Sequence, residues 1–150
     1  MLTAEIIQHS RLLFHSFEKA TGKRLIHLNA SGADLADALY TAPFVLLSHG
    51  TEADPVFNYA NLTAQKLWEL NWGNFTRMPS RLSAEKVSQA ERQAMLEEAK
   101  NKEFISNYKG VRISSTGRRF IIKEALLWNM YDEQENYRGQ AATFSQWEFL

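Results

Sequence analysis

The chain has 150 residues, of which 45% are hydrophobic and 23% are charged, as is ordinary for one globular domain that buries a core. Its 17 Lys and Arg side chains balance 17 Asp and Glu side chains, which argues against a nucleic-acid partner or an anionic membrane surface, because both need clustered positive charge. The absence of cysteine excludes disulfides, thiolate metal sites and cysteine nucleophiles, and fits a cytoplasmic protein.

The N-terminal stretch is expected to form a helix. It lacks the charged start and long apolar run of a signal peptide, and the longest apolar run of the chain, around 42–47, is far too short to span a bilayer. Thr3 is a suitable N-cap, and apolar side chains recur at helical spacing until a stop signal at Gly22. The apolar face of this helix comprises Leu13, Phe14 and Phe17. This face must pack against another surface.

The start of the helix expected in segment 24–41 is ambiguous. Either Ser31 or Asp34 would cap this short helix, and Pro43 would end it. Short apolar runs at 44–48 and 56–60 predict two strands, which the turn sequence TEADP connects.

Helices are expected between the second strand and residue 102. Asn61 is a strong N-cap candidate for the first of them, and two short helical turns follow at 72–75 and 78–82. Ser83 would cap a longer helix that ends near Lys102. The inward face of this longer helix is expected to comprise Val87, Ala90, Ala94 and Met95.

The segment 104–147 predicts three consecutive antiparallel strands. Thr116-Gly117 is suited to a tight hairpin turn, and folding on that turn places alternating apolar residues of both arms on one face. These residues are Val111 and Ile113 on the first arm, and Phe120 and Ile122 on the second.

The acidic loop 132–136 would make the second turn of this segment. Folding there places Trp128 and Met130 over Gly139 and Ala141, so large side chains on one strand face small ones on the next. This pattern fits either plain packing complementarity or a pocket beneath Trp128.

The order of strand, strand, helices and three strands predicts an α+β domain with one antiparallel sheet. This order resembles the PAS fold, in which FNYAN at 57–61 would be the second strand leading into the first inner helix. The resemblance implies a five-stranded antiparallel sheet with helices on one face. It divides the chain into an N-terminal helical extension, 1–41, and a PAS-like domain, 42–150.

More specifically, the chain resembles the MEKHLA domain. The matching segments are APFVLLSHG, DPVFNYAN, MPSRLSAE, YKGVRISSTGRRF, LLWNMYDE and GQAATFSQW, and the unbroken run GVRISSTGRRF makes the match specific. MEKHLA is a PAS-like domain found alone in bacteria and at the C-terminus of plant homeodomain–leucine-zipper regulators. The resemblance implies sensing of a small molecule, redox state or light, without enzymatic activity and with no settled ligand. We expect the stand-alone form.

The stretch 57–82 also aligns without a gap with flavin-binding light sensors of the PAS superfamily. Their photoactive motif is Asn-Cys-Arg-Phe-Leu-Gln, which corresponds here to PSRLSA at 79–84. Ser80 occupies the position of the reactive Cys, and a hydroxyl cannot perform the thiol addition, so the covalent photocycle is excluded. Arg81 matches an Arg that contacts flavin phosphate, which leaves non-covalent flavin binding open. Haem PAS domains ligate iron through a His on the long helix, and 84–102 contains none, so haem is not expected.

A ligand cavity between the sheet and the inner helices would be lined by aromatic side chains and one arginine. The candidate ligand-binding residues are Phe57, Tyr59, Trp68, Trp72, Arg81, Trp128 and Met130, together with Trp147. The alternative is that the aromatic residues fill the core and that Arg81 forms a surface salt bridge, which are the default uses of such side chains.

Other polar groups point to structural roles. The run SSTGRR at 114–119 would cradle a phosphate, but a hairpin turn with solvated arginines is the favoured interpretation. The histidines have no metal-ligand spacing, so no metal site is expected, and a hydrogen-bonded or solvated side chain is favoured even for His49, which ends a strand near the expected cavity. No Ser/His/Asp elbow, HExxH motif or P-loop is present.

The PAS resemblance also suggests an interface, because an N-terminal helix often covers the outer face of the sheet, its own or a partner's. The candidate interface residues are Leu13, Phe14 and Phe17 on the helix, and Leu127 and Phe144 on the sheet, where they are expected on the outer face beside Ala125 and Ala142. We therefore expect a homodimer, with capping inside one chain as an equal alternative.

The function favoured is a cytoplasmic sensory or regulatory module that binds a small molecule, a protein partner or both, without catalysis and without nucleic acid or membrane. Ligand occupancy would shift the sheet face or the N-terminal helix. The cofactor is unknown. The alternatives are a ligand-free dimerisation module with a filled core and, least favoured, a small enzyme that uses the cavity.

Overall fold

The computed structural model describes residues 2–150, which form one antiparallel sheet with helices on both faces. The helices are α1 (Ala4–Thr21), α2 (Gly32–Tyr40), α3 (Leu62–Trp68), α4 (Trp72–Phe75), the 3₁₀ helix η1 (Ser80–Ser83) and α5 (Lys86–Asn101). The strands are β1 (Val45–His49), β2 (Phe57–Ala60), β3 (Phe104–Ile113), β4 (Arg119–Tyr131), β5 (Tyr137–Phe144) and β6 (Gln146–Phe149). Across the part of the chain so described, no helix is long and apolar enough to cross a membrane.

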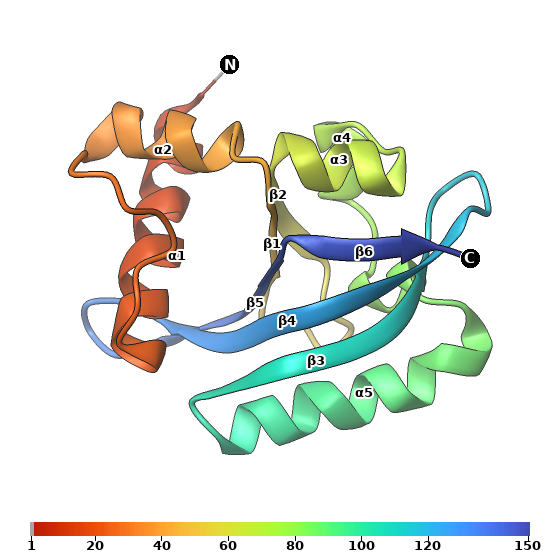
Figure 1. Ribbon diagram of the computed structural model, residues 1–150. Helices are drawn as coiled ribbons and strands as arrows, with labels where there is room; N and C mark the ends of the chain where they lie inside the picture. The colour runs from red at the N-terminus through yellow and green to blue at the C-terminus, as the bar shows by residue number, and fades with distance from the viewer. Residues whose placement is uncertain (1) are drawn as a thin grey trace.

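The strand order is β2-β1-β5-β4-β3, and β6 pairs with β4 beyond the end of β5. The α+β class and the antiparallel sheet are confirmed, and β6 adds a sixth short strand to the five expected, because Trp147 and Phe149 continue the pairing with Ile122 and Phe120. Figure 1 shows α5 beneath β3 and β4. It shows α1 and α2 beside the end of β4 that leads into β5. We call the face covered by α3, α4 and α5 the inner face, and the face covered by α1 and α2 the outer face.

The predicted capping residues mark both ends of α1 and the start of α3. The hydroxyl of Thr3 accepts from the Ile6 N–H at 3.2 Å, and α1 stops at Gly22, whose φ of 73° favours glycine. Asn61 Oδ1 accepts from the Ala64 N–H at 3.1 Å and so begins α3. Of the two candidate caps for α2, Ser31 occupies the N-cap position, without a capping hydrogen bond from its side chain.

The prediction of which α5 residues face inward was wrong. The helix begins at Lys86 with Glu85 as its N-cap, and the expected cap Ser83 belongs to η1. Three of the four expected inward residues, Val87, Ala90 and Ala94, are exposed, and only Met95 is partly buried. The buried residues of α5 are instead Arg92, Leu96 and Ala99, which share one face at helical spacing. Leu96 and Ala99 pack against Leu127, and this contact sets the rotation of the helix.

The expected register of the β3–β4 hairpin was also wrong, by one residue. Ile113 pairs with Arg119 around a five-residue loop, so Arg112 lies opposite Phe120. A slip of one residue turns every side chain to the other face. Arg112 therefore faces inward with Phe120, and the apolar Val111 and Ile113, which are only partly buried, face the other way.

After the shifted register of the hairpin, a bulge within β4 again changes which side chains of the strand face inward. Glu124 has a φ of 49°, and β4 has one residue more than β3 between the pairs Gly110–Ile122 and Tyr108–Ala125. Ile122 and Ala125 consequently both face inward. Beyond the bulge the odd-numbered residues of β4 face inward and the even-numbered ones outward, the reverse of the expected arrangement.

Trp128 and Met130 do lie opposite Ala141 and Gly139, as predicted, but on the outer face under α1. No pocket opens there, because a Cβ at Gly139 would collide with the carbonyl oxygen of His49 and α1 covers Trp128. The indole Nε1 of Trp128 donates to Ser16 Oγ at 3.0 Å.

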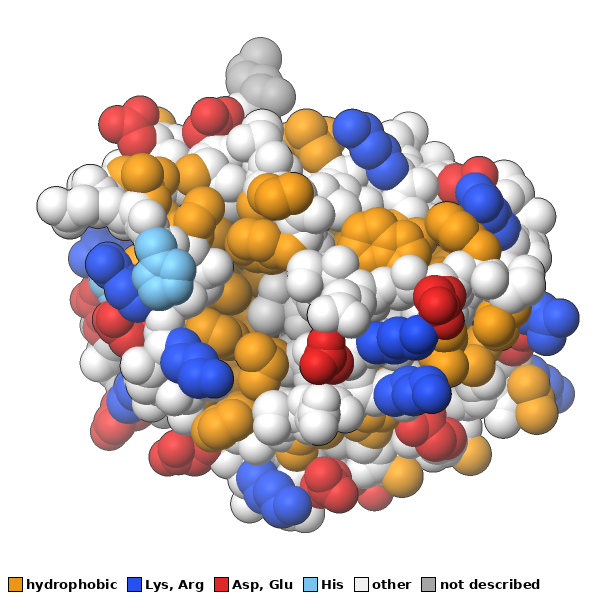
Figure 2. Space-filling view, viewed as in Figure 1, with side chains coloured by type: hydrophobic (Ala, Val, Ile, Leu, Met, Phe, Trp, Pro, Cys, Tyr) orange, Lys and Arg blue, Asp and Glu red, His pale blue; other side chains and the backbone are white. Residues whose placement is uncertain are grey.

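The apolar face of α1 packs on the chain's own sheet. Phe17 meets Trp128 edge to face at 4.8 Å between ring centroids, and Leu13 and Phe14 are at most 4% exposed. Figure 2 shows hydrophobic side chains on the visible face between α1 and the strands. The structure thus has the intramolecular form of capping, one of the two alternatives expected for this face.

Replacing Phe17 with Ala should lower the free energy of unfolding by about 3–5 kcal/mol, the usual cost of deleting a buried aromatic side chain. Urea denaturation followed by circular dichroism measures this. The control is Val87→Ala on the exposed side of α5, for which a change within about 0.5 kcal/mol is expected. Equal effects of the two substitutions would show that α1 does not dock on the sheet.

Candidate functional site

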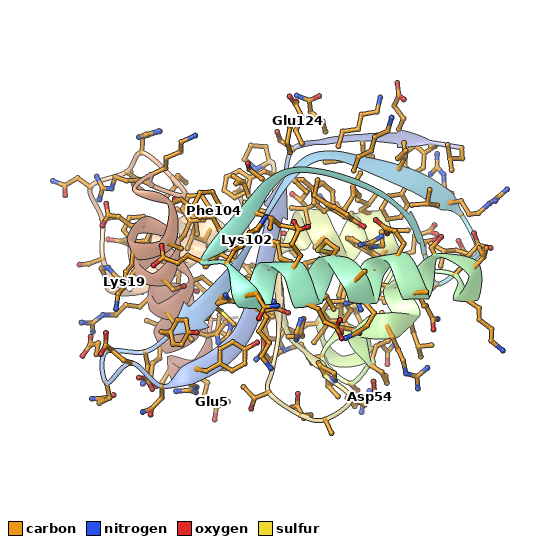
Figure 3. All side chains as sticks on the ribbon, turned by 90° about the horizontal axis from the view of Figure 1, so that it is seen from below. Glu5, Lys19, Asp54, Lys102, Phe104 and Glu124 are labelled. Atoms are coloured by element: carbon orange, nitrogen blue, oxygen red, sulfur yellow. The ribbon has the colours of Figure 1, made fainter. Side chains whose placement is uncertain are left out.

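A cavity of about 50 Å³ lies between the inner face of the sheet and the inner helices. Its apolar wall includes Leu47, Phe57, Trp68, Leu96, Ala125, Leu127, Ala142 and Phe144. Its polar groups come from His49, Ser83, Arg92, Tyr108, Arg112 and Gln140. Figure 3 shows α5 lying across β3 and β4, with side chains filling the layer between them.

Two arginines are buried at this cavity without a carboxylate. Arg92 is 6% exposed and Arg112 is 4% exposed, and neither guanidinium has a salt-bridge partner within 4 Å among residues 2–150. Burial, and then the charge of Arg112, lower the pKa of Arg92 to about 10, so Arg92 stays charged at neutral pH. Two like charges buried beside apolar side chains cost folding free energy unless an opposite charge binds between them.

The two guanidinium groups are unequally satisfied. Arg112 donates through Nη1 to the Val111 carbonyl at 2.8 Å and through Nη2 to the Tyr108 hydroxyl at 3.1 Å. The Tyr108 hydroxyl donates in turn to the Glu91 carboxylate at 2.9 Å, so Glu91 reaches Arg112 only through Tyr108. Arg92 donates no hydrogen bond to any side chain or backbone group among residues 2–150, and its guanidinium nitrogens keep a small contact with solvent. Most N–H groups of the two guanidinium groups therefore have no hydrogen-bond acceptor within the protein.

His49 contributes an acceptor without a donor. Its Nδ1 lies 3.1 Å from the Gly50 carbonyl, which can only accept, so Nδ1 carries the proton and Nε2 has a free lone pair. Nε2 is buried and has no partner among the described residues. The nearby Gln140 Nε2 does not donate to His49, because it donates to the Leu96 carbonyl and to Asn129 Oδ1, although the Gln140 side chain lies close enough to raise the pKa of His49 slightly against the effect of burial. Burial is the main cause that lowers the pKa of His49, so its ring is neutral at pH 7.

The structure divides the candidate ligand residues between the two faces of the sheet. Phe57 and Trp68 line the cavity as expected. Tyr59, Trp72, Trp128 and Met130 instead belong to the outer-face core with α1 and α2. Trp147 packs at the edge of the inner core. The bulge and the pairing of β2 with β1 explain this division, because they set which residues of each strand point inward.

Arg81, Leu127 and Phe144 also differ from expectation. Arg81 is half exposed and pairs with Asp54 at 3.2 Å, at the periphery of the molecule where Figure 3 labels Asp54. Leu127 and Phe144, expected on the outer face, line the cavity on the inner face. Leu127 lies beyond the bulge in β4, and Phe144 on β5 lies two residues after Ala142, the residue that pairs with Leu127.

The SSTGRR turn binds the end of α3. The hydroxyls of Ser114 and Thr116 donate to the Glu69 carboxylate, and the Ser115 N–H donates to the Trp68 carbonyl. These hydrogen bonds lower the pKa of Glu69. The groups that would cradle a phosphate are thus engaged within the chain, in agreement with the hairpin-turn interpretation.

The residues that sequence reasoning missed are Arg92, Tyr108 and Gln140. A signal for Arg92 was present, since it shares a helical face with Leu96 and Ala99 at spacings of four and seven residues. Val87 and Met95 made a competing apolar pattern. No local pattern distinguishes Arg112 from the solvated arginines of the same hairpin, because one residue of register decides its face.

A second hollow is an open groove of about 390 Å³ between α1 and the end of α5. Figure 3 places Lys19, Lys102 and Phe104 around this junction. Its buried polar groups already have partners, since Ser16 accepts from Trp128 and the Asn129 amide donates to the Ala99 and Lys102 carbonyls. The inner cavity is therefore the better candidate for a site.

The outer face carries a polar cluster under α1. His9 Nε2 donates to Ser48 Oγ at 2.8 Å, and Ser48 Oγ donates to Asn58 Oδ1 at 2.6 Å. The His9 ring stacks on Tyr59. Burial, and then the charge of Arg138, lower the pKa of His9 to about 4.

Stability should therefore depend on the protonation of His9. The unfolded chain titrates at the ordinary pKa of 6.5 and the folded chain at about 4, so the unfolded state binds more protons between these values. The free energy of unfolding falls as the pH drops from 6.5 to 4, by up to about 3 kcal/mol from this group.

Urea denaturation at pH 7, 6, 5 and 4 measures this dependence. His9→Gln should lose much of the slope, with the remainder coming in part from His49, whose pKa is also lowered. The control His15→Gln, at an exposed position of α1, should keep the full slope. Identical slopes for the two variants would contradict the assignment.

A flavin does not fit the inner cavity. Pockets for ligands of that size measure roughly 300–1,000 Å³, several times the volume found. The arginine that would meet a flavin phosphate, Arg81, points away toward Asp54. Within residues 2–150, no three His, Asp or Glu side chains cluster in a way that would hold a metal ion.

Comparisons with known proteins agree on family and fold. The family model described as the MEKHLA domain matches residues 7–149. No curated protein matches the sequence. Among solved structures, a PAS domain from Colwellia psychrerythraea superposes with a TM-score of 0.66 at 10% identity, covering 78% of this chain and 94% of that one.

Two further structures extend this comparison. A PAS domain from a two-component sensor histidine kinase has a TM-score of 0.57 at 17% identity, covering 76% of this chain and 91% of that one. The light-state dimer of the fungal blue-light photoreceptor Vivid has a TM-score of 0.59 at 12% identity, covering 88% of this chain and 89% of that one. These likenesses establish the PAS fold.

Proposed function

The chain belongs to the MEKHLA domain family, and from this premise we propose that it is a PAS-type sensory or regulatory module without catalytic activity. Its ligand is a small molecule in the inner cavity. The observation that carries the proposal is the set of incompletely bonded polar groups at this cavity: the Arg92 guanidinium, the Arg112 guanidinium with two hydrogen bonds, and the buried, free Nε2 of His49. Buried polar groups without partners are expensive, and a ligand would supply the partners.

The cavity lining supports binding rather than catalysis. Ser83 has the hydroxyl that would serve as a nucleophile, but it donates to the Ser80 carbonyl at 2.7 Å. His49, the candidate base at the cavity, makes no hydrogen bond to Ser83, so no nucleophile–base pair forms there. We infer a cytoplasmic setting and no nucleic-acid partner, supported by the lack of cysteine and the balance of charges.

The proposed output is the packing of α1. Adjacent residues of one strand face opposite sides of the sheet, so a strand connects the cavity to the outer face. On β1, His49 lines the cavity and its neighbour Ser48 binds His9 of α1. On β4, Asn129 binds the end of α5 and its neighbour Trp128 binds Ser16 of α1. A ligand that moves β1 on binding would change the contact of Ser48 with His9, and one that moves α5 would change the contact of Trp128 with Ser16.

A homodimer is part of the proposal, and the dimeric Vivid structure supports it as a precedent in this fold. An interface formed by Leu13, Phe14 and Phe17 would require α1 to leave the sheet, since these residues are buried against it. Light scattering across micromolar concentrations tests the dimer. A constant monomer mass would contradict it.

Narrowing the cavity should abolish binding. The test is a thermal-shift panel of small molecules, namely acetate, glycolate, glycine, urea, ethanol and imidazole, with the wild type and Ala142→Val. At least one compound should raise the midpoint of the wild type, and none should raise that of the variant, because two added methyl groups occupy the small cavity. The control Ala53→Val changes an exposed loop and should respond like the wild type.

Hydrogen exchange of α1 with and without the bound compound tests the output. We expect exchange in α1 to change on binding, and unchanged exchange there would remove α1 as the output element. If no compound shifts the wild type, and the wild type and Ala142→Val unfold identically in every solution, the sensory proposal fails.

A further inference from the structure

We propose that the inner cavity binds a small monocarboxylate, with its carboxylate held by Arg92 and Arg112 and a hydroxyl group on the same ligand donating to His49. This inference rests on the proposed function and names the chemical class of its ligand.

Charge is the first argument for an anion. Two guanidinium charges face the cavity, and the carboxylate linked to them is that of Glu91, one hydrogen bond removed through Tyr108. Two positive charges against one negative charge leave one positive charge unbalanced at the site. A single negative charge on the ligand neutralises it, whereas a dianion would leave an excess negative charge between apolar walls.

Geometry favours a carboxylate as the anion. A guanidinium group presents parallel N–H donors that match the two oxygens of a carboxylate. Arg92 has no hydrogen bond within the described chain, and Arg112 uses two of its donors. Leu47, Phe57 and Phe144 provide an apolar wall for the carbon atoms of the ligand.

Size sets the upper limit on the ligand. One water needs roughly 10–15 Å³ of such volume, so about 50 Å³ admits about three to five non-hydrogen atoms. Acetate and glycolate fall within this range. Larger dicarboxylates do not.

His49 adds the preference for a hydroxyl. Its Nε2 is buried as an acceptor without a donor, and the ring is 5% exposed. A carboxylate oxygen cannot donate to it, but a hydroxyl can. A 2-hydroxy acid such as glycolate offers both groups within the permitted size, so glycolate should bind more tightly than acetate.

The test is thermal shift and isothermal calorimetry of the wild-type chain with sodium glycolate, acetate, phosphate and chloride at equal ionic strength. Glycolate should raise the midpoint most and acetate less, while phosphate and chloride should give no saturable effect. The loss of the hydroxyl contact should cost about tenfold in affinity, the value of one buried hydrogen bond.

Three variants locate the site. Arg92→Met should lose the glycolate response, and without anion its midpoint should equal or exceed that of the wild type, because an uncompensated charge is removed. His49→Phe should bind glycolate no more tightly than acetate. The matched control Arg81→Met removes an exposed arginine and should keep the full response.

Several outcomes would overturn the inference. These are a glycolate effect no larger than that of chloride, phosphate binding as tightly as glycolate, or a glycolate response that survives Arg92→Met. A destabilised Arg92→Met chain would also count against it, since a purely structural arginine predicts that loss. If a neutral compound binds the wild type but not Ala142→Val while no carboxylate binds, the anion inference fails and the sensory proposal stands.

Discussion

The extra residue at Glu124 decides which side chains of β4 meet the cavity and which meet α1. Its φ of 49° lies in a region that side chains rarely adopt, and it shifts the alternation of the strand by one residue. Without this shift Trp128 would point at α5 and Leu127 at α1. With it, Leu127 joins the cavity wall and Trp128 provides the surface on which Phe17 packs.

The two faces of the sheet thus have separate cores with shared strands. The inner core is aromatic around Trp68 and surrounds a small cavity with charged groups. The outer core joins α1 and α2 to Trp128 and Met130. A sheet between two cores transmits a displacement because neighbouring residues of a strand cannot move independently. The pairs Ser48–His49 and Trp128–Asn129 therefore couple the cavity to α1 in the proposed mechanism.

The electrostatics of the cavity are incomplete within the described chain. Buried arginines are normally paired, and Arg92 and Arg112 have only Tyr108 and a backbone carbonyl between them. Elsewhere in the molecule the arginines in ion pairs, such as Arg81 with Asp54 and Arg119 with Glu85, are largely exposed. This contrast is the physical basis for the proposal that a ligand binds in the inner cavity rather than at the surface.

The sequence by itself determined the elements other than β6, their order and the pairing of Trp128 with Ala141, because caps such as Thr3 and Asn61 and turn residues act locally. The MEKHLA resemblance added the fold, which the family match and the solved structures confirm. Only the tertiary structure decided which face each side chain takes. A one-residue difference in the hairpin turned Arg112 inward, the bulge turned Trp128 outward, and the packing of Leu96 on Leu127 brought Arg92 to the cavity. Those choices depend on contacts between different elements, which the spacing of residues within one element does not specify, even where it carries a signal as for Arg92.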